Sequence, residues 1–192
     1  LTPISSMKKY QIIYADPPWK YNSRADHKTR FRGGAYGHYK LMGMDELRNM
    51  SSSIKEIANK NCALFMWATF PMLSEALWLM EQWGFEYKTL GFLWMKANKI
   101  NGFPFFGVGF YSKSNAEICL LGIKGRMKPI TNKISQVVLA PRNEHSQKPK
   151  EVRNKIVELF GNLPRIELFA RQKTEGWDVW GNEVESDIIL TP

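Results

Sequence analysis

The stretch YQIIYADPPW, residues 10–19, joins a short apolar run to an acid, two prolines and a tryptophan. The run at 10–15 predicts a buried β-strand. A residue before proline is driven into an extended conformation, and each proline fixes its own φ and removes a backbone donor. Asp16, Pro17 and Pro18 therefore predict a stiff strand end that presents only acceptors, with the flat apolar face of Trp19 beside them.

Acceptors beside a flat ring suit a planar group that carries an NH₂. The 6-amino group of adenine fits, because both of its hydrogens can be accepted while the ring stacks on Trp19; an amide or the amino group of cytosine fits nearly as well. The amino nitrogen of adenine is a poor nucleophile, and two acceptors would hold it in place and favour the geometry of attack. A strand that ends in a proline turn with a core tryptophan explains the same residues without any chemistry, so the motif alone leaves both interpretations open.

Apolar runs alternate with helical patterns along the chain. This alternation predicts an α/β fold, a single sheet with helices on both of its faces. Open α/β sheets bind ligands beyond the carboxyl ends of their strands. The ends of the first strand and of a strand at 165–170 are therefore predicted to form two halves of a site on one edge of the sheet. The other predicted strands are 62–68, 85–96, 116–125 and 136–140, and the predicted helices are 44–60, 71–83 and 148–161.

The length of 192 residues is ordinary for one domain with a sizeable core. We expect residues 1–192 to form a single domain, with residues 1–9 either disordered or foreign to the natural sequence and residues 186–192 forming a tail. No apolar run approaches the roughly 20 residues that span a bilayer, and the first residues contain no apolar core of a signal peptide. The sequence therefore predicts no membrane association.

Cysteine and histidine do not form a metal-binding pattern. Cys62 and Cys119 both lie in apolar runs, which predicts buried free thiols rather than a disulfide or a metal pair. His27, His38 and His145 have no ligand spacing among themselves or with the cysteines. No metal site is predicted.

The net charge of +9 and the pI near 9.5 favour an anionic partner, of which nucleic acid is the usual one. A soluble surface alone would also account for this charge, but its placement is informative. Cations and aromatic rings are interleaved with glycines between residues 20 and 40, and we expect this gate loop to reach phosphates with its cations and to stack on bases with its rings. The segment 97–115 is predicted to be a second clamp or a partner surface. The gate-loop residues are Lys20, Tyr21, Arg24, Lys28, Arg30, Phe31, Arg32, Tyr36, Tyr39 and Lys40.

The strand followed by ADPPW resembles the N6-adenine methyltransferases named for the seventy-kilodalton subunit of the mRNA adenosine methyltransferase. Further segments agree in the same order over residues 10–185, namely HYKLMGMDEL, LFMWATFPMLSEALWLMEQWGFEY with LWMKAN, SNAEICLLGIKGR, RNEHSQKPKEV and IELFARQKTEGWDVWGNE. The resemblance implies a Rossmann-like S-adenosylmethionine-dependent methyltransferase fold of permuted order, with the catalytic strand first and the cofactor strand late. Lys173 and Thr174 stand where the eukaryotic pattern has His-Asn, so the chain looks like the prokaryotic or phage branch.

The resemblance also implies a role for individual residues. Asp16, Pro17, Pro18 and Trp19 would form the site of the target adenine, with Asp16 also near the methyl donor. Lys148 would meet the methionine carboxylate of the cofactor, although an exposed lysine at a helix start is a common alternative. The remaining implied roles are cofactor-pocket lining for Phe169 and Arg171, ribose binding for Asn182 and Glu183, packing for Trp177 and Trp180, and the anchoring of a loop for Glu117.

The implied function is transfer of a methyl group from S-adenosylmethionine to the 6-amino group of adenine in DNA. The alternatives are an RNA adenine N6-methyltransferase and a methyltransferase-like nucleic-acid-binding subunit that needs a partner. Because the amino group is paired and stacked in a duplex, the enzyme would flip the base or act on single strands. The expected location is the cytoplasm of a prokaryotic or phage-infected cell, and both a homodimer and a methyltransferase-like partner subunit stay open.

Overall fold

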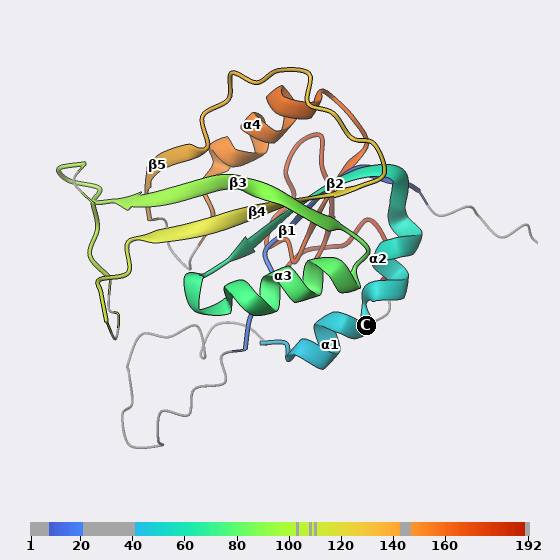
Figure 1. Ribbon diagram of the computed structural model, residues 1–192, viewed down its shortest axis with the longest axis horizontal. Coiled ribbons are helices and arrows are strands. Elements are labelled where there is room, and N and C mark those ends of the chain that lie inside the picture. Colours follow the sequence, from blue (N-terminus) through green and yellow to red (C-terminus); the bar gives the residue numbers. More distant parts are fainter. Residues whose placement is uncertain are drawn as a thin grey trace, which may run out of the picture.

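The computed structural model describes residues 8–20, 41–102, 104–107, 109, 111–142 and 147–190 (Figure 1). Within these ranges the chain forms one sheet, four α-helices and a short 3₁₀ turn. The strands are β1 (Tyr10–Ala15), β2 (Ala58–Ala68), β3 (Glu86–Ala97), β4 (Ala116–Lys124), β5 (Val137–Pro141), β6 (Arg165–Leu168) and β7 (Asp178–Trp180). The helices are α1 (Met44–Asn49), α2 (Ser51–Ile57), α3 (Leu73–Gln82) and α4 (Lys150–Phe160), and the 3₁₀ turn is η2 (Phe70–Met72).

The seven strands lie in the order β5-β3-β4-β2-β1-β6-β7. Neighbouring strands are parallel except at β4, which runs antiparallel to both β2 and β3. The carboxyl ends of the other strands therefore meet at one edge of the sheet, which we call the carboxyl edge. At this edge the first strand is a direct neighbour of a late one, since Ala15 pairs with Leu168. The predicted α/β fold with permuted order is confirmed.

Helices cover both faces of the sheet, as predicted: α1, α2 and α3 lie on one face and α4 on the other (Figure 1). Successive side chains of a strand point to opposite faces. On β1, Ile13 and Ala15 belong to the core beneath α1–α3, whereas Ile12 and Tyr14 belong to the core beneath α4. Both cores thus depend on the first strand, which is why the sequence just before Asp16 is apolar at every position except Gln11.

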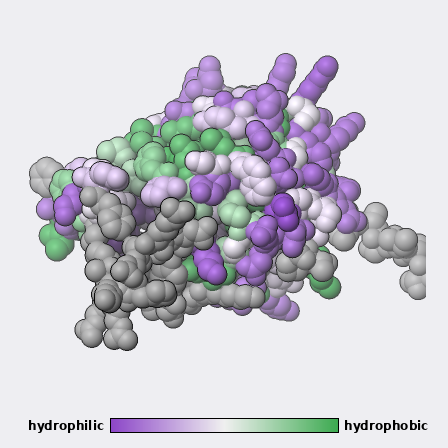
Figure 2. Space-filling view, turned by 60° about the horizontal axis from the view of Figure 1, so that its bottom comes forward, coloured by the Kyte–Doolittle hydropathy of each residue, from purple (hydrophilic) through white to green (hydrophobic). Residues whose placement is uncertain are grey.

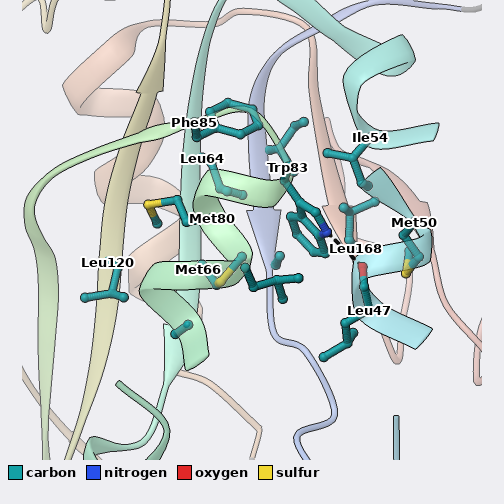
Figure 3. Close-up of a cluster of buried hydrophobic side chains, with 14 of the residues drawn as sticks. Leu47, Met50, Ile54, Leu64, Met66, Met80, Trp83, Phe85, Leu120 and Leu168 are labelled. Carbon is teal, nitrogen blue, oxygen red and sulfur yellow. Dashed lines mark hydrogen bonds between the residues drawn. The ribbon is translucent and has the colours of Figure 1, made fainter. Parts of the chain in front are cut away.

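Trp83 shows how the short helix α1 is held in place (Figure 3). Its ring is fully buried, and its indole N–H donates a hydrogen bond of 2.9 Å to the carbonyl oxygen of Leu47. Leu47 lies in the last turn of α1, where a carbonyl has no partner within the helix. The tryptophan therefore buries a large apolar ring and satisfies a helix end at the same time.

The predicted helix 44–60 is wrong in two respects. It is divided at Met50 into α1 and α2, and the hydroxyl of Ser51 donates a hydrogen bond to the carbonyl oxygen of Arg48 at this break. Serine hydroxyls compete in this way with the regular helix ladder. In addition, residues 58–60 belong to β2, because Ala58 pairs with Tyr10 on the first strand.

Other boundaries differ more modestly. Pro71 lies in η2 rather than in α3, and Lys148 precedes α4, which begins at Lys150. The strand β7 was not predicted, because three residues are too few to show a period. Leu190, in the segment expected to be a tail, is buried in the core beneath α1–α3.

The two cysteines are free and buried, as predicted. Burial raises the pKa of the Cys62 thiol to about 12 and that of Cys119 well above its ordinary value. Within the described ranges no helix has the length and apolarity needed to cross a membrane, and no cluster of histidine, cysteine or carboxylate side chains could hold a metal ion. Hydrophilic side chains cover much of the face that Figure 2 presents, with smaller hydrophobic areas among them.

Candidate active site

The segment Asp16–Trp19 leaves the carboxyl edge at β1 and folds back in a tight turn. The Trp19 N–H donates to the Pro17 carbonyl at 2.9 Å, and the Met42 N–H donates to the Pro18 carbonyl at 2.9 Å. The prolines have no N–H to offer, so their side of the chain presents only oxygens. Each carbonyl oxygen has two lone pairs, so both keep acceptor capacity next to the Asp16 carboxylate.

Trp19 does not form the open stacking face that the sequence suggested. Its side chain packs into the core beneath α1–α3, with a relative exposure of 6%, and its indole N–H donates to the carbonyl oxygen of Trp67 at 3.0 Å. The ring therefore holds the Asp16–Trp19 turn in place from the core side. The aromatic face that this position was expected to offer is not part of the pocket wall described below.

The ends of β6 and β7 form the opposite wall. Phe169 follows β6 with a φ of 61°, a left-handed conformation that costs a non-glycine residue of order 1–3 kcal/mol. Its ring packs edge-to-face on Trp180 at 5.4 Å between centroids. Ala170 then donates its N–H to the Trp180 carbonyl at 3.0 Å. The strain is consistent with a chain that must turn sharply to place the residues after Phe169 at the carboxyl edge.

Gly181 allows these two strand ends to lie together. A Cβ on this residue would lie 2.1 Å from the Ala170 carbonyl oxygen and 2.8 Å from the Ala170 nitrogen, so only glycine fits. The following turn is closed by Ser186, whose hydroxyl oxygen accepts the Gly181 N–H at 3.1 Å. This close approach is what carries Asn182 and Glu183 toward the end of β1.

A pocket of about 440 Å³, partly open to solvent, lies between the two walls. It brings together seven of the predicted site residues, which follow the ends of β6 and β7 and, far from these in the sequence, the end of β1. Glu183 approaches Arg171 across the opening, with 3.8 Å between Oε1 and Nε. The lining residues are Asp16, Pro17, Pro18, Phe169, Ala170, Arg171, Asn182 and Glu183.

Lys148 is not on the wall of the pocket but lies behind Asp16. Its Nζ is 2.9 Å from Asp16 Oδ2 and 3.2 Å from Glu117 Oε2, and it also lies 5.6 Å from the ring centroid of Trp67. Burial opposes its charge, but the two carboxylates outweigh burial and raise the pKa of Lys148. The lysine is therefore a fixed cation that contacts the pocket through Asp16.

Lys96 extends this ion-pair chain and was missed by sequence reasoning. Its Nζ lies 2.6 Å from Glu117 Oε1, so Glu117 is held between two lysines. Burial alone would raise the pKa of Glu117, but Lys148 and Lys96 together lower it. The sequence did contain a signal for this residue, because Lys96 is a lone cation directly after the apolar residues Leu93, Trp94 and Met95. Glu117 was expected to anchor a loop, and the structure gives it an ion-pair partner on each side, Lys96 and Lys148.

The predicted gate loop falls mostly outside the described residues. Only Lys20 of its residues is described, and its N–H donates to the Met42 carbonyl at 3.2 Å. The positions of the other gate-loop residues remain predictions.

Trp177 was expected to pack rather than to contact a ligand. Its ring lies 5.8 Å from that of Tyr14, measured between centroids.

Replacing Gly181 by alanine is expected to lower the free energy of unfolding by about 1–3 kcal/mol, because the new methyl group would overlap the Ala170 backbone. Denaturant titration followed by circular dichroism measures the loss. Gly43→Ala is the matched control, since a Cβ there meets nothing closer than 3.6 Å. Equal stability of the two variants would show that the contact between the ends of β6 and β7 is not as tight as described.

Comparison with known proteins shows which family the sequence resembles. A family model described as MT-A70 matches residues 10–183. The type II methyltransferase M.MunI of Mycoplasma sp is 34% identical over 200 residues, which covers 96% of this chain and 82% of that protein.

Similarity to longer proteins is weaker. The human N(6)-adenosine-methyltransferase catalytic subunit METTL3 is 24% identical over 193 residues, covering 98% of this chain but 30% of that protein. An N(6)-adenosine-methyltransferase MT-A70-like protein of Arabidopsis thaliana is 25% identical over 178 residues, covering 91% of this chain and 24% of that protein. The chain therefore corresponds to less than a third of these two relatives and to most of the Mycoplasma protein.

Proposed function

The chain belongs to the MT-A70 family, and on this basis we propose that it transfers a methyl group from S-adenosylmethionine to the 6-amino group of adenine in a nucleic acid. The observation that carries the proposal is the pocket at the carboxyl edge. It joins the acceptor-only segment Asp16–Pro18 to the polar pair Asn182 and Glu183. One wall suits an amino group, and the other suits a ribose.

The residues present fit S-adenosylmethionine, which combines a ribose, an ammonium group and a carboxylate. Glu183 and Asn182 offer acceptors and a donor to vicinal hydroxyls, an arrangement common at nucleoside sites. Asp16 offers a carboxylate to the ammonium group of the cofactor. Two cations lie near the site for its carboxylate, Arg171 on the pocket wall and Lys148 behind Asp16. Phe169 supplies an apolar wall between these polar ends.

When bound, the cofactor would supply an electrophilic methyl group to the lone pair of the amino nitrogen, with its sulfur keeping the electrons of the S–C bond and the surplus N–H proton passing to solvent. The chain's contribution is to hold the nitrogen. The Asp16 carboxylate would accept one N–H, and a proline carbonyl would accept the other. Such fixed acceptors favour the transition state by positioning and by preorganised electrostatics.

We propose DNA rather than RNA as the substrate polymer. The chain is more similar, over more of the partner's length, to the Mycoplasma type II methyltransferase than to the N(6)-adenosine-methyltransferases. The net charge of +9 supports a polyanionic partner of either kind. In keeping with such a substrate, we propose that the protein acts in the cytoplasm.

The ribose assignment leads to a prediction. Glu183→Ala is expected to weaken the affinity for S-adenosylmethionine by about 10-fold, since a hydrogen bond to a charged group contributes about 1.5 kcal/mol. Isothermal titration calorimetry measures this change. Glu185→Ala is the control, because Glu185 lies in the same turn and is exposed like Glu183 but does not line the pocket. Equal affinities of the two variants would remove Glu183 from the cofactor site.

The substrate is tested by incubating the protein with labelled S-adenosylmethionine and, in parallel, with duplex DNA, single-stranded DNA and RNA of matched sequence. The proposal predicts transfer to DNA that exceeds transfer to RNA. A fourth oligonucleotide without adenine is the control and should accept no label. Preferential labelling of RNA would overturn the choice of polymer but leave adenine as the target.

A further inference from the structure

A buried ion pair links α4 to β6 beside the pocket but does not line it. Arg153 on α4 donates from Nε to Glu167 Oε2 at 2.7 Å and from its terminal nitrogen to Glu167 Oε1 at 2.5 Å. Both side chains are 8% exposed. Burial would lower the pKa of Arg153, but its hydrogen bonds to Glu167 and the nearby charges raise it. The two hydrogen bonds make the contact bidentate.

Tyr14 and Trp67 connect this pair to the turn at Asp16. The guanidinium of Arg153 lies 5.4 Å from the ring centroid of Tyr14, whose hydroxyl accepts the indole N–H of Trp67 at 2.6 Å. The carbonyl of Trp67 in turn accepts the indole N–H of Trp19 at 3.0 Å. Tyr14 and Glu167 are also direct neighbours across β1 and β6. We call these five residues the α4 network.

Three members of the α4 network, Tyr14, Trp19 and Glu167, lie close in sequence to pocket residues, and Arg153 lies on the helix that follows Lys148, which contacts Asp16. Tyr14 comes two residues before Asp16, and Glu167 comes two residues before Phe169. Arg153 lies one turn into α4, close after Lys148. The contacts thus connect β6, which leads to Phe169, with α4 and with the segment that carries Asp16.

Stability alone does not account for a buried ion pair. The cost of removing two charges from water is comparable to their attraction, and apolar replacements of similar volume are often neutral or stabilising. A bidentate arginine–carboxylate contact does, however, accept only one relative position of its two partners. Its distinctive contribution is therefore geometric.

We propose that Arg153 is a positioning residue, which through Glu167 and Tyr14 holds α4 and β6 at the separation that the S-adenosylmethionine pocket requires. The proposal rests on the function proposed above. It assigns no contact between Arg153 and the cofactor. It predicts that affinity for the cofactor depends on a side chain that the cofactor does not touch.

The test separates position from stability. Replacing both partners, Arg153→Met with Glu167→Met, leaves no unpaired buried charge, so the melting temperature should equal or exceed that of the unchanged protein. Affinity for S-adenosylmethionine by calorimetry should nevertheless fall by about 10-fold, the loss expected when one hydrogen bond to the cofactor is no longer made. Lys88→Gln with Glu86→Gln removes an exposed pair and serves as the control. It should change neither quantity.

A double variant that keeps both its melting temperature and its cofactor affinity would overturn the proposal. If the double variant does not fold, Arg153→Lys is measured instead, because lysine keeps the positive charge but cannot make the bidentate contact with Glu167. A weaker affinity of this variant for S-adenosylmethionine would support the positioning role of Arg153. An unchanged affinity would overturn it. Failure of the proposed function is distinguishable, because the unchanged protein itself would then not bind S-adenosylmethionine.

Discussion

Asp16→Asn is expected to lower the rate constant of methyl transfer by about 10²–10³-fold, the range found when one preorganised group is removed from an active site. Asparagine keeps the shape of the side chain, but one of its two terminal groups is a donor and its charge is gone. The amino nitrogen of the target base would then lose an acceptor in the segment that presents only acceptors. Single-turnover transfer of labelled methyl groups measures the effect.

Two controls accompany this variant. Asp45→Asn changes an exposed aspartate on α1, whose ion pair with Arg48 spans 3.4 Å, and should leave the rate unaffected. The melting temperature of Asp16→Asn should change little, since Lys148 keeps its contact with Glu117. A folded Asp16→Asn protein with a rate within a few-fold of the unchanged protein would remove Asp16 from the catalytic centre.

Lys148→Met is expected to be the most destabilising of the substitutions considered, at about 3 kcal/mol, because it takes the shared partner from two carboxylates that are largely buried. Urea unfolding at neutral pH measures the loss. Lys150→Met, two residues further along and exposed, is the control and should be nearly neutral. A loss no larger than that of the control would mean that the ion-pair chain does not stabilise the fold.

The effect of Lys148→Met should also depend on pH. In the unchanged protein the pKa of Glu117 lies below its ordinary value of 4.5, so its ionised form contributes stability above that pH and the contribution is lost as the pH falls. Removing Lys148 takes away part of this lowering, and burial then opposes the charge. The stability difference between the two proteins should therefore be largest at neutral pH and should shrink as the pH falls below 4.5. A difference that is independent of pH would contradict the assigned charges.

The strand ends were predictable from sequence because each carries a local signal. Asp16-Pro17-Pro18 marks the end of β1, and the predicted meeting of this end with that of the strand at 165–170 on one edge of the sheet is confirmed. Both predictions depend on short-range rules about prolines and about parallel strands. They did not require knowledge of how side chains pack.

Features that depend on packing were not predictable in this way. Whether Trp19 points into the pocket or into the core is decided by the helices above it, and it points into the core. The meeting of Lys96, Glu117 and Lys148 depends on the antiparallel insertion of β4 between β2 and β3, which periodicity cannot reveal. Nothing in the local sequence marks Arg153 as buried, yet its side chain is buried against β6.

We propose that the pocket at the carboxyl edge holds adenine while its 6-amino group is methylated, and this proposal can be tested in one experiment. It is tested most directly by incubating the protein with S-adenosylmethionine that carries a deuterated methyl group and an oligonucleotide containing every base, followed by mass spectrometry of the digested nucleosides. We expect the deuterated methyl group on N6 of adenine with the unchanged protein, and its loss with Asp16→Asn. Label on the amino group of cytosine, or undiminished labelling of adenine in Asp16→Asn, would contradict it.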